Sequence, residues 1–139
     1  MNLKKWLSDN KITEVECLVS DIAGIPRGKI VPVEKYINSS SSDGLRLPEY
    51  VFGQNVTGDY GDSDVLGETV GDVVLKSDAK TVRLVPWYKE PTAQIIHDAF
   101  YFDGSAVDVS SREVLKNVLK LFDSIGLRPV VAPELEFFL

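Results

Sequence analysis

The chain has 139 residues, enough for one domain with a sizeable core or for one domain plus part of another. A net charge of −6 without any basic cluster argues against nucleic acid as a main partner, and no apolar run is long enough to cross a membrane. The lone cysteine, Cys17, and the lack of a signal-peptide stretch favour a cytoplasmic location.

The first third of the sequence predicts a helix followed by a β-hairpin. Apolar spacing indicates a short helix over residues 3–9, and alternation indicates strands at 14–20 and 29–33. The turn-rich residues 21–28 join the two strands, and Pro32 indicates an edge strand or a strand end. Cys17 alternates with apolar neighbours and is expected to be a buried thiol. Asp21 and Arg27 predict a loop ion pair of little energetic value, or else a hairpin that contacts a neighbouring subunit.

The middle of the chain is richer in glycine. One helical turn is expected at 34–38, a flexible serine-rich segment at 39–44, and a long loop over 46–71. Strands are predicted at 72–75, 80–85 and 92–102. His97 lies on the last of these and is expected to be a packed or surface histidine rather than a metal ligand. Trp87 and Tyr88 are expected to pack at a loop edge, with stacking on a ligand as the alternative.

The pattern changes after residue 104. Ser110 and Glu113 form a capping box, and apolar residues at helical spacing predict a helix over 111–125 that Gly126 ends. A final strand is expected at 128–139. We therefore divide the chain into residues 1–105 and an incomplete unit at 106–139. The apolar stripe of the helix should be covered by the first unit or by a second copy of the chain.

Two carboxylates in the last segment are the candidate metal ligands. Side chains alternate along a strand, so Glu134 and Glu136 would share one face, roughly 6–7 Å apart. Carboxylates beside apolar residues are tolerated when cations face them. The alternative is a solvated strand face without a ligand. We assign no catalytic residue and no nucleotide-binding residue within these 139 positions.

The sequence Pro-Glu-Leu-Glu-Phe-Phe-Leu at 133–139 resembles the first metal-binding strand of the glutamine synthetase family. Weaker matches are the hairpin sequence at 20–29, the stretch Gly-Asp-Val-Val-Leu-Lys-Ser-Asp at 71–78, and Arg112 near the start of its helix. The resemblance covers essentially the whole chain, which would be the first third or so of a full enzyme.

The resemblance implies an α+β fold, with a β-grasp domain over 1–105 and the start of a catalytic domain at 106–139. It implies an enzyme that joins ammonia or another amine to glutamate, using ATP and Mg²⁺ or Mn²⁺, within a homo-oligomeric ring. Glu136 would bind the cation nearer glutamate and Glu134 the cation on the nucleotide phosphates. The fragment alone is expected to be inactive and to bind no cofactor stably, with a dimer as one expected state.

One departure bears on the substrate. Bacterial glutamine synthetases carry a Phe-Asp-Gly-Ser-Ser sequence whose aspartate helps bind ammonium, and the comparable residues 45–53 here lack it. Glu49 is an acid nearby, without an assigned role. The hairpin also resembles the branch that joins glutamate to polyamines. The competing hypothesis is a self-contained β-grasp module that binds partners or regulates without catalysis.

Overall fold

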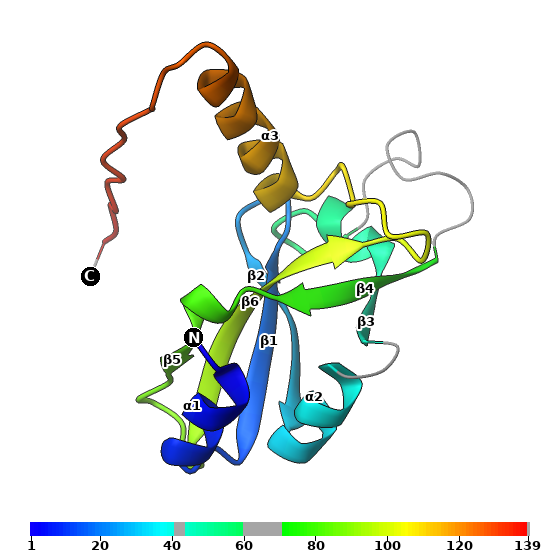
Figure 1. Cartoon of the computed structure of the whole chain (residues 1–139), viewed down its shortest axis with the longest axis vertical. Coiled ribbons are helices and arrows are strands. Elements are labelled where there is room, and N and C mark those ends of the chain that lie inside the picture. The colour runs from blue at the N-terminus through cyan, green and yellow to red at the C-terminus, as the bar shows by residue number, and fades with distance from the viewer. Residues whose placement is uncertain (41–43, 60–70, 139) are drawn as a thin grey trace.

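The computed structural model describes residues 1–40, 44–59 and 71–138, which form a mixed α/β fold (Figure 1). Helices α1 and α2 lie at one end of a sheet, and α3 projects from the opposite end. The elements in chain order are α1 (Leu3–Asp9), β1 (Glu14–Ser20), β2 (Pro26–Pro32), α2 (Val33–Ser40), β3 (Leu45–Pro48), the 3-10 helix η1 (Glu49–Gly53), β4 (Asp72–Ser77), the 3-10 helix η2 (Ala79–Thr81), β5 (Arg83–Leu84), β6 (Thr92–Phe100) and α3 (Ser111–Ser124).

Strand β6 is the centre of the sheet. It runs parallel to β1 on one side, with Val15 opposite Ala93, and antiparallel to β4 and β5 on the other. The order is β2-β1-β6-β4-β3, so β2 is an edge strand and Pro32 is its last residue. The predicted hairpin of β1 and β2 and the interpretation of Pro32 are both confirmed.

Alternation along the strands builds the core. On β1, Val15, Cys17 and Val19 face inward, and Ile95 and His97 do the same on β6. Leu7 of α1 and Tyr36 of α2 cover these strands and are themselves buried. The buried position expected for Cys17 is therefore confirmed, and His97 is packed rather than at the surface.

Some element boundaries differ from the sequence prediction. Within the predicted strand 80–85, residues 80 and 81 belong to the turn η2, and only Arg83–Leu84 pair with β6. The predicted loop 46–71 includes most of β3 and all of η1, because Leu45 and Leu47 alternate inward against β4. Residues 41–43, 60–70 and 139 lie outside the described residues. They include half of the segment 39–44 predicted to be flexible, whereas residues 39 and 40 end α2.

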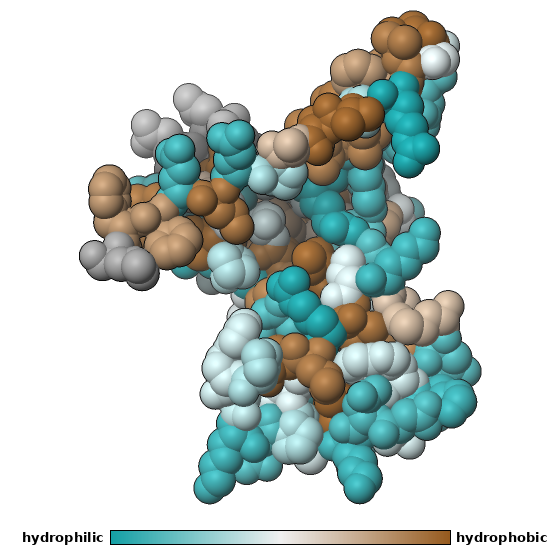
Figure 2. Space-filling view, turned by 90° about the vertical axis from the view of Figure 1, so that its left-hand side faces the viewer, coloured by the Kyte–Doolittle hydropathy of each residue, from teal (hydrophilic) through white to brown (hydrophobic). Residues whose placement is uncertain are grey.

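Helix α3 forms as predicted, and Gly126 follows it with a φ of 72°. Ser110 caps the helix through its carbonyl oxygen, which accepts from the amides of Glu113 and Val114, and not through its side chain. The apolar stripe does not pack on the sheet: Leu121 is 67% exposed and Ile125 is 68% exposed. Brown surface gathers over the upper part of Figure 2, where α3 and the C-terminal segment lie.

The predicted final strand is wrong for this structure. Residues 128–138 have no regular secondary structure; they turn back from the far end of α3 and lie apart from the sheet (Figure 1). The physical reason is that a strand needs a neighbour to complete its backbone hydrogen bonds, and the described residues pair none with this segment. Among the described helices, none is both long and apolar enough to span a bilayer.

Candidate functional site

Glu134 and Glu136 lie on the extended C-terminal segment, and both side chains are exposed. No group of three or more His, Cys, Asp or Glu side chains gathers at metal-binding distance within residues 1–40, 44–59 and 71–138. A divalent cation such as Mg²⁺ needs about six oxygen ligands, so two carboxylates alone do not enclose it. Their assignment as metal ligands stays a prediction.

An ion-pair cluster fixes the start of α3, the helix that precedes this segment. The Arg112 Nε donates to Asp98 Oδ1 at 2.8 Å, and Arg112 also pairs with Asp78. Lys116 Nζ lies 2.6 Å from Asp98 Oδ2. Partial burial alone would raise the pKa of Asp98, but hydrogen bonds and charges from Lys116 and Arg112 lower it below its ordinary value. This cluster sets the direction in which α3 leaves the sheet.

The β1–β2 turn forms a second junction near α3. The Asp21 carboxylate is buried, and it accepts from the Ile25 amide and from Arg27 Nε, each at 2.8 Å. The Asp21 carbonyl oxygen accepts from Ser111 Oγ at 2.9 Å, and Arg27 donates to the Asn55 carbonyl at 3.0 Å. The predicted ion pair between Asp21 and Arg27 is confirmed, and its carboxylate is buried.

Glu49 is already engaged within the chain. The Tyr101 hydroxyl donates to Glu49 Oε1 at 2.6 Å, linking η1 to the residue just after β6. This hydrogen bond and burial raise the pKa of Tyr101 well above its usual range. The Glu49 carboxylate thus orders the end of the sheet.

The remaining reactive groups are structural. Burial raises the pKa of the Cys17 thiol to about 12, so it is not a nucleophile at neutral pH. Burial also lowers the pKa of His97 to about 4, so its imidazole is neutral. Trp87 is 69% exposed, against the expected loop-edge packing, and Tyr88 donates to Glu16 at 3.2 Å.

Sequence reasoning missed the partners of Arg112 and one outward-facing polar chain. Gln94 donates to Glu16 at 2.6 Å and accepts from Arg83. The available signal was alternation: Glu16 and Gln94 alternate with core residues and lie opposite each other on neighbouring strands, where Gln94 is buried. Asp98 also alternates with core residues of β6, and it pairs with Arg112 and Lys116 of α3.

No protein-family model matches the chain. Among curated proteins, it is 28% identical over 142 residues to a glutamate–isopropylamine ligase of Pseudomonas sp., covering 100% of this chain and 31% of the relative. It is 30% identical over 140 residues to the gamma-glutamylputrescine synthetase PuuA of Escherichia coli, covering 99% of this chain and 29% of the relative. A glutamine synthetase of Pyrococcus horikoshii is 28% identical over 93% of the chain and 26% of its own length.

Solved structures share the fold. A glutamine synthase homologue superposes with a TM-score of 0.69 at 20% identity, covering 83% of this chain and 28% of the other. A structure described as a GmaS/ADP complex superposes with a TM-score of 0.67 at 18% identity, covering 89% of this chain and 26% of the other.

Sequence and fold therefore agree on one class of proteins, ligases and synthetases that share this α/β architecture. The curated relatives and the structural neighbours of this chain match the glutamine synthetase family. The chain spans about 30% of the length of the relatives named above, so it corresponds to part of such a protein.

Proposed function

We propose that the chain is the N-terminal portion of an ATP-dependent ligase that joins an amine to the γ-carboxylate of glutamate. The observation that carries this is a sequence match along the whole chain to two enzymes named for such reactions. The match covers about 30% of the length of each enzyme. Residues 1–105 form the β-grasp domain in this proposal, and residues 106–139 begin the catalytic domain. The parent protein is a cytoplasmic homo-oligomer.

The Pro-Glu-Leu-Glu sequence at 133–136 contributes two metal ligands to the active site. Carboxylate oxygens suit Mg²⁺ or Mn²⁺, and both side chains are exposed and available for further partners. Glu136 holds the cation nearer glutamate, and Glu134 holds the cation on the nucleotide phosphates. The cations, when bound, offset phosphate charge during transfer to the glutamate carboxylate.

Uncovered apolar surface supports an incomplete catalytic domain. Val114 is 50% exposed and Leu115 is 57% exposed on α3, and Phe137 is 76% exposed beyond it. A contiguous apolar face of this kind is unfavourable in water and favours burial against further structure. Neighbouring strands would also complete the backbone hydrogen bonds that residues 128–138 lack.

The amine is an organic amine rather than ammonium. The comparable region lacks the aspartate that helps bind ammonium, and the nearby Glu49 is held by the Tyr101 hydroxyl. Relatives named for isopropylamine, putrescine and ethanolamide products support the same assignment, although glutamine synthetases of comparable identity are also found.

The test uses the complete open reading frame that contains this chain. Purified protein is given glutamate, ATP and Mg²⁺ with ammonium, isopropylamine, putrescine or ethanolamine, and the γ-glutamyl amide is measured by mass spectrometry. Glu134→Gln and Glu136→Gln should each abolish the product, whereas the exposed Glu90→Gln should not.

Two results would count against the proposal. Product formation that survives both glutamine substitutions would remove the metal assignment. A folded full-length protein without ligase activity on any amine would favour the binding-module hypothesis instead. The 139-residue chain by itself should release no phosphate that depends on glutamate and amine.

A further inference from the structure

Two adjoining cavities lie between α1 and α2, at the end of the molecule opposite α3 (Figure 1). Their volumes are about 420 and 400 Å³, and both are lined by Lys4, Leu7 and Ile37. We call the combined space the α1–α2 groove. Its size is that of a small-molecule site.

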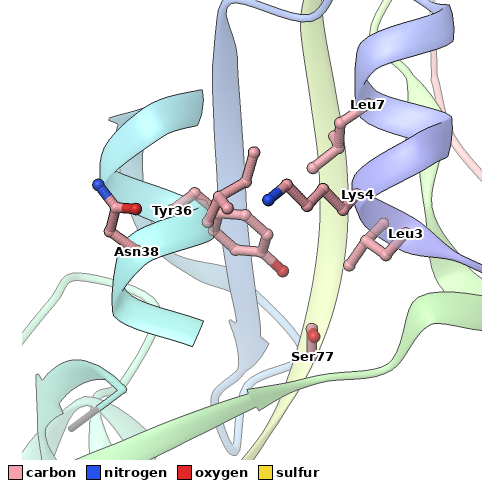
Figure 3. A pocket seen from close by; sticks show the side chains of 7 residues that line it. Leu3, Lys4, Leu7, Tyr36, Asn38 and Ser77 are labelled. Atoms are coloured by element: carbon pink, nitrogen blue, oxygen red, sulfur yellow. The ribbon is translucent and has the colours of Figure 1, made fainter. Parts of the chain in front are cut away.

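The walls of the groove are largely apolar. They come from α1 and the residues after it on one side and from α2 on the other. The apolar lining residues are Leu3, Leu7, Ile12, Val33 and Ile37. Figure 3 shows Leu3 and Leu7 pointing toward the ring of Tyr36 across the cavity. An aliphatic chain placed here would contact apolar side chains of both helices and would be removed from water on both sides.

The charged residues of the groove are all cationic. Lys4 extends into the cavity toward Tyr36 (Figure 3), and Lys11 lines the adjoining cavity. Neither lysine forms an ion pair within the described residues, and the lining contains no Asp or Glu. By contrast, Lys5 is paired with Asp9 at 2.7 Å. Two unpaired ammonium groups beside an apolar groove are notable in a chain of net charge −6.

A hydrogen-bonded chain holds the inner wall. His97 Nδ1 lies 3.0 Å from the Ile95 carbonyl oxygen, which can only accept, so Nδ1 carries the proton. His97 Nε2 therefore accepts from the Tyr36 hydroxyl at 3.3 Å. Ser77 lies beside that hydroxyl and hydrogen-bonds to it (Figure 3). The polar groups of the wall are satisfied internally, which fixes the Tyr36 ring as a rigid surface.

We propose that the α1–α2 groove binds a small amphiphilic carboxylate, with its apolar chain between the two helices and its carboxylate beside Lys4 and Lys11. Charge complementarity selects the anion, since a cationic or neutral chain of the same length would leave both ammonium groups without a counterion. The site is independent of the proposed ligase chemistry.

Octanoate is the probe, titrated into the ¹⁵N-labelled chain and followed by amide chemical shifts. We expect saturable binding with a Kd of roughly 0.1–1 mM, with shifts concentrated at Leu7, Tyr36 and Ser77. Lys4→Met and Lys11→Met keep the apolar stem and should each weaken binding by about tenfold. Lys5→Met is the matched control on the same helix and should bind like the wild type.

Several results would overturn the proposal. These are no saturable shifts with octanoate, equal affinity for octylammonium or octanol, or binding unaffected by both lysine substitutions. The chain could also dimerise in sedimentation experiments, with the groove amides protected in the dimer. That result would assign the surface to a second copy of the chain instead. Circular dichroism of each variant establishes that lost binding is not lost folding.

Discussion

The buried Asp21 carboxylate should be a major stabilising group of the β1–β2 turn. Asp21→Ala removes two hydrogen bonds of 2.8 Å, one from the Ile25 amide and one from Arg27 Nε. Hydrogen bonds to a charged group contribute about 1.5–3 kcal/mol each, and breaking a buried ion pair costs about 3–5 kcal/mol. The Arg27 side chain is 24% exposed, so it can be partly rehydrated after the substitution. We therefore expect the free energy of unfolding to fall by about 3 kcal/mol, the lower end of the range for a buried ion pair.

This cost converts to a measurable shift in melting temperature. An unfolding entropy of about 2.1 cal/mol/K per residue gives roughly 0.3 kcal/mol/K for a chain of this length, so Tm should fall by about 10 °C. Asp9→Ala is the matched control, because the Lys5–Asp9 pair is exposed and should contribute about 0.5 kcal/mol or less. Thermal unfolding followed by circular dichroism measures the shift in Tm, and urea unfolding measures the change in unfolding free energy.

A double-mutant cycle separates the ion pair from the backbone contact. Asp21→Asn keeps the size of the side chain and removes its charge, so combining it with Arg27→Gln measures the coupling between the two groups. If Asp21→Ala costs no more than the Asp9→Ala control, the buried carboxylate is not stabilising and the reasoning fails.

Two further predictions concern the same sheet. Gly28→Ala should destabilise the chain by more than about 3 kcal/mol, since a Cβ there would lie 1.8 Å from the Cys17 carbonyl oxygen; Gly24→Ala has positive φ but open space and should cost about 1 kcal/mol in the same urea titration. The folded pKa of His97, about 4, is below its unfolded value of 6.5, so stability should be complete above pH 6.5 and fall by up to about 3 kcal/mol between pH 6.5 and 4. His97→Gln should flatten that slope, and an unchanged slope would mean other groups cause it.

Local patterns in the sequence were sufficient for elements that pack on their neighbours along one face. The alternation at 14–20 and the apolar spacing at 3–9 predict β1 and α1 with their observed bounds. The same patterns could not reveal that β6 lies parallel to β1, because that pairing joins residues about 78 positions apart in sequence. Nor could they show that Asp21 is buried, since burial depends on η1 and α3 closing over the turn.

Failure of the predicted strand at 128–139 has a different cause. Its alternating carboxylate and apolar residues give a β pattern, but a pattern forms a strand only beside another strand. The candidate metal ligands, Glu134 and Glu136, lie on a segment that pairs with none of the described strands. The sequence thus predicts the identity of the candidate ligands, but contacts within the described residues do not fix their arrangement.

Helix α3 lies between the packed sheet and the unpaired C-terminal segment. A 14-residue helix is marginal in water by itself, so its stability must come from contacts. Those contacts are all at its beginning, where Ser111, Arg112 and Lys116 reach Asp21, Asp78 and Asp98. The last turns have exposed apolar side chains and no such anchor among the described residues. The sheet therefore fixes where α3 starts. In the proposed ligase, further structure over α3 would fix where Glu134 and Glu136 lie. In the proposed ligase, a metal site would form only when that covering structure is present, which ties catalysis to completed folding of the second unit.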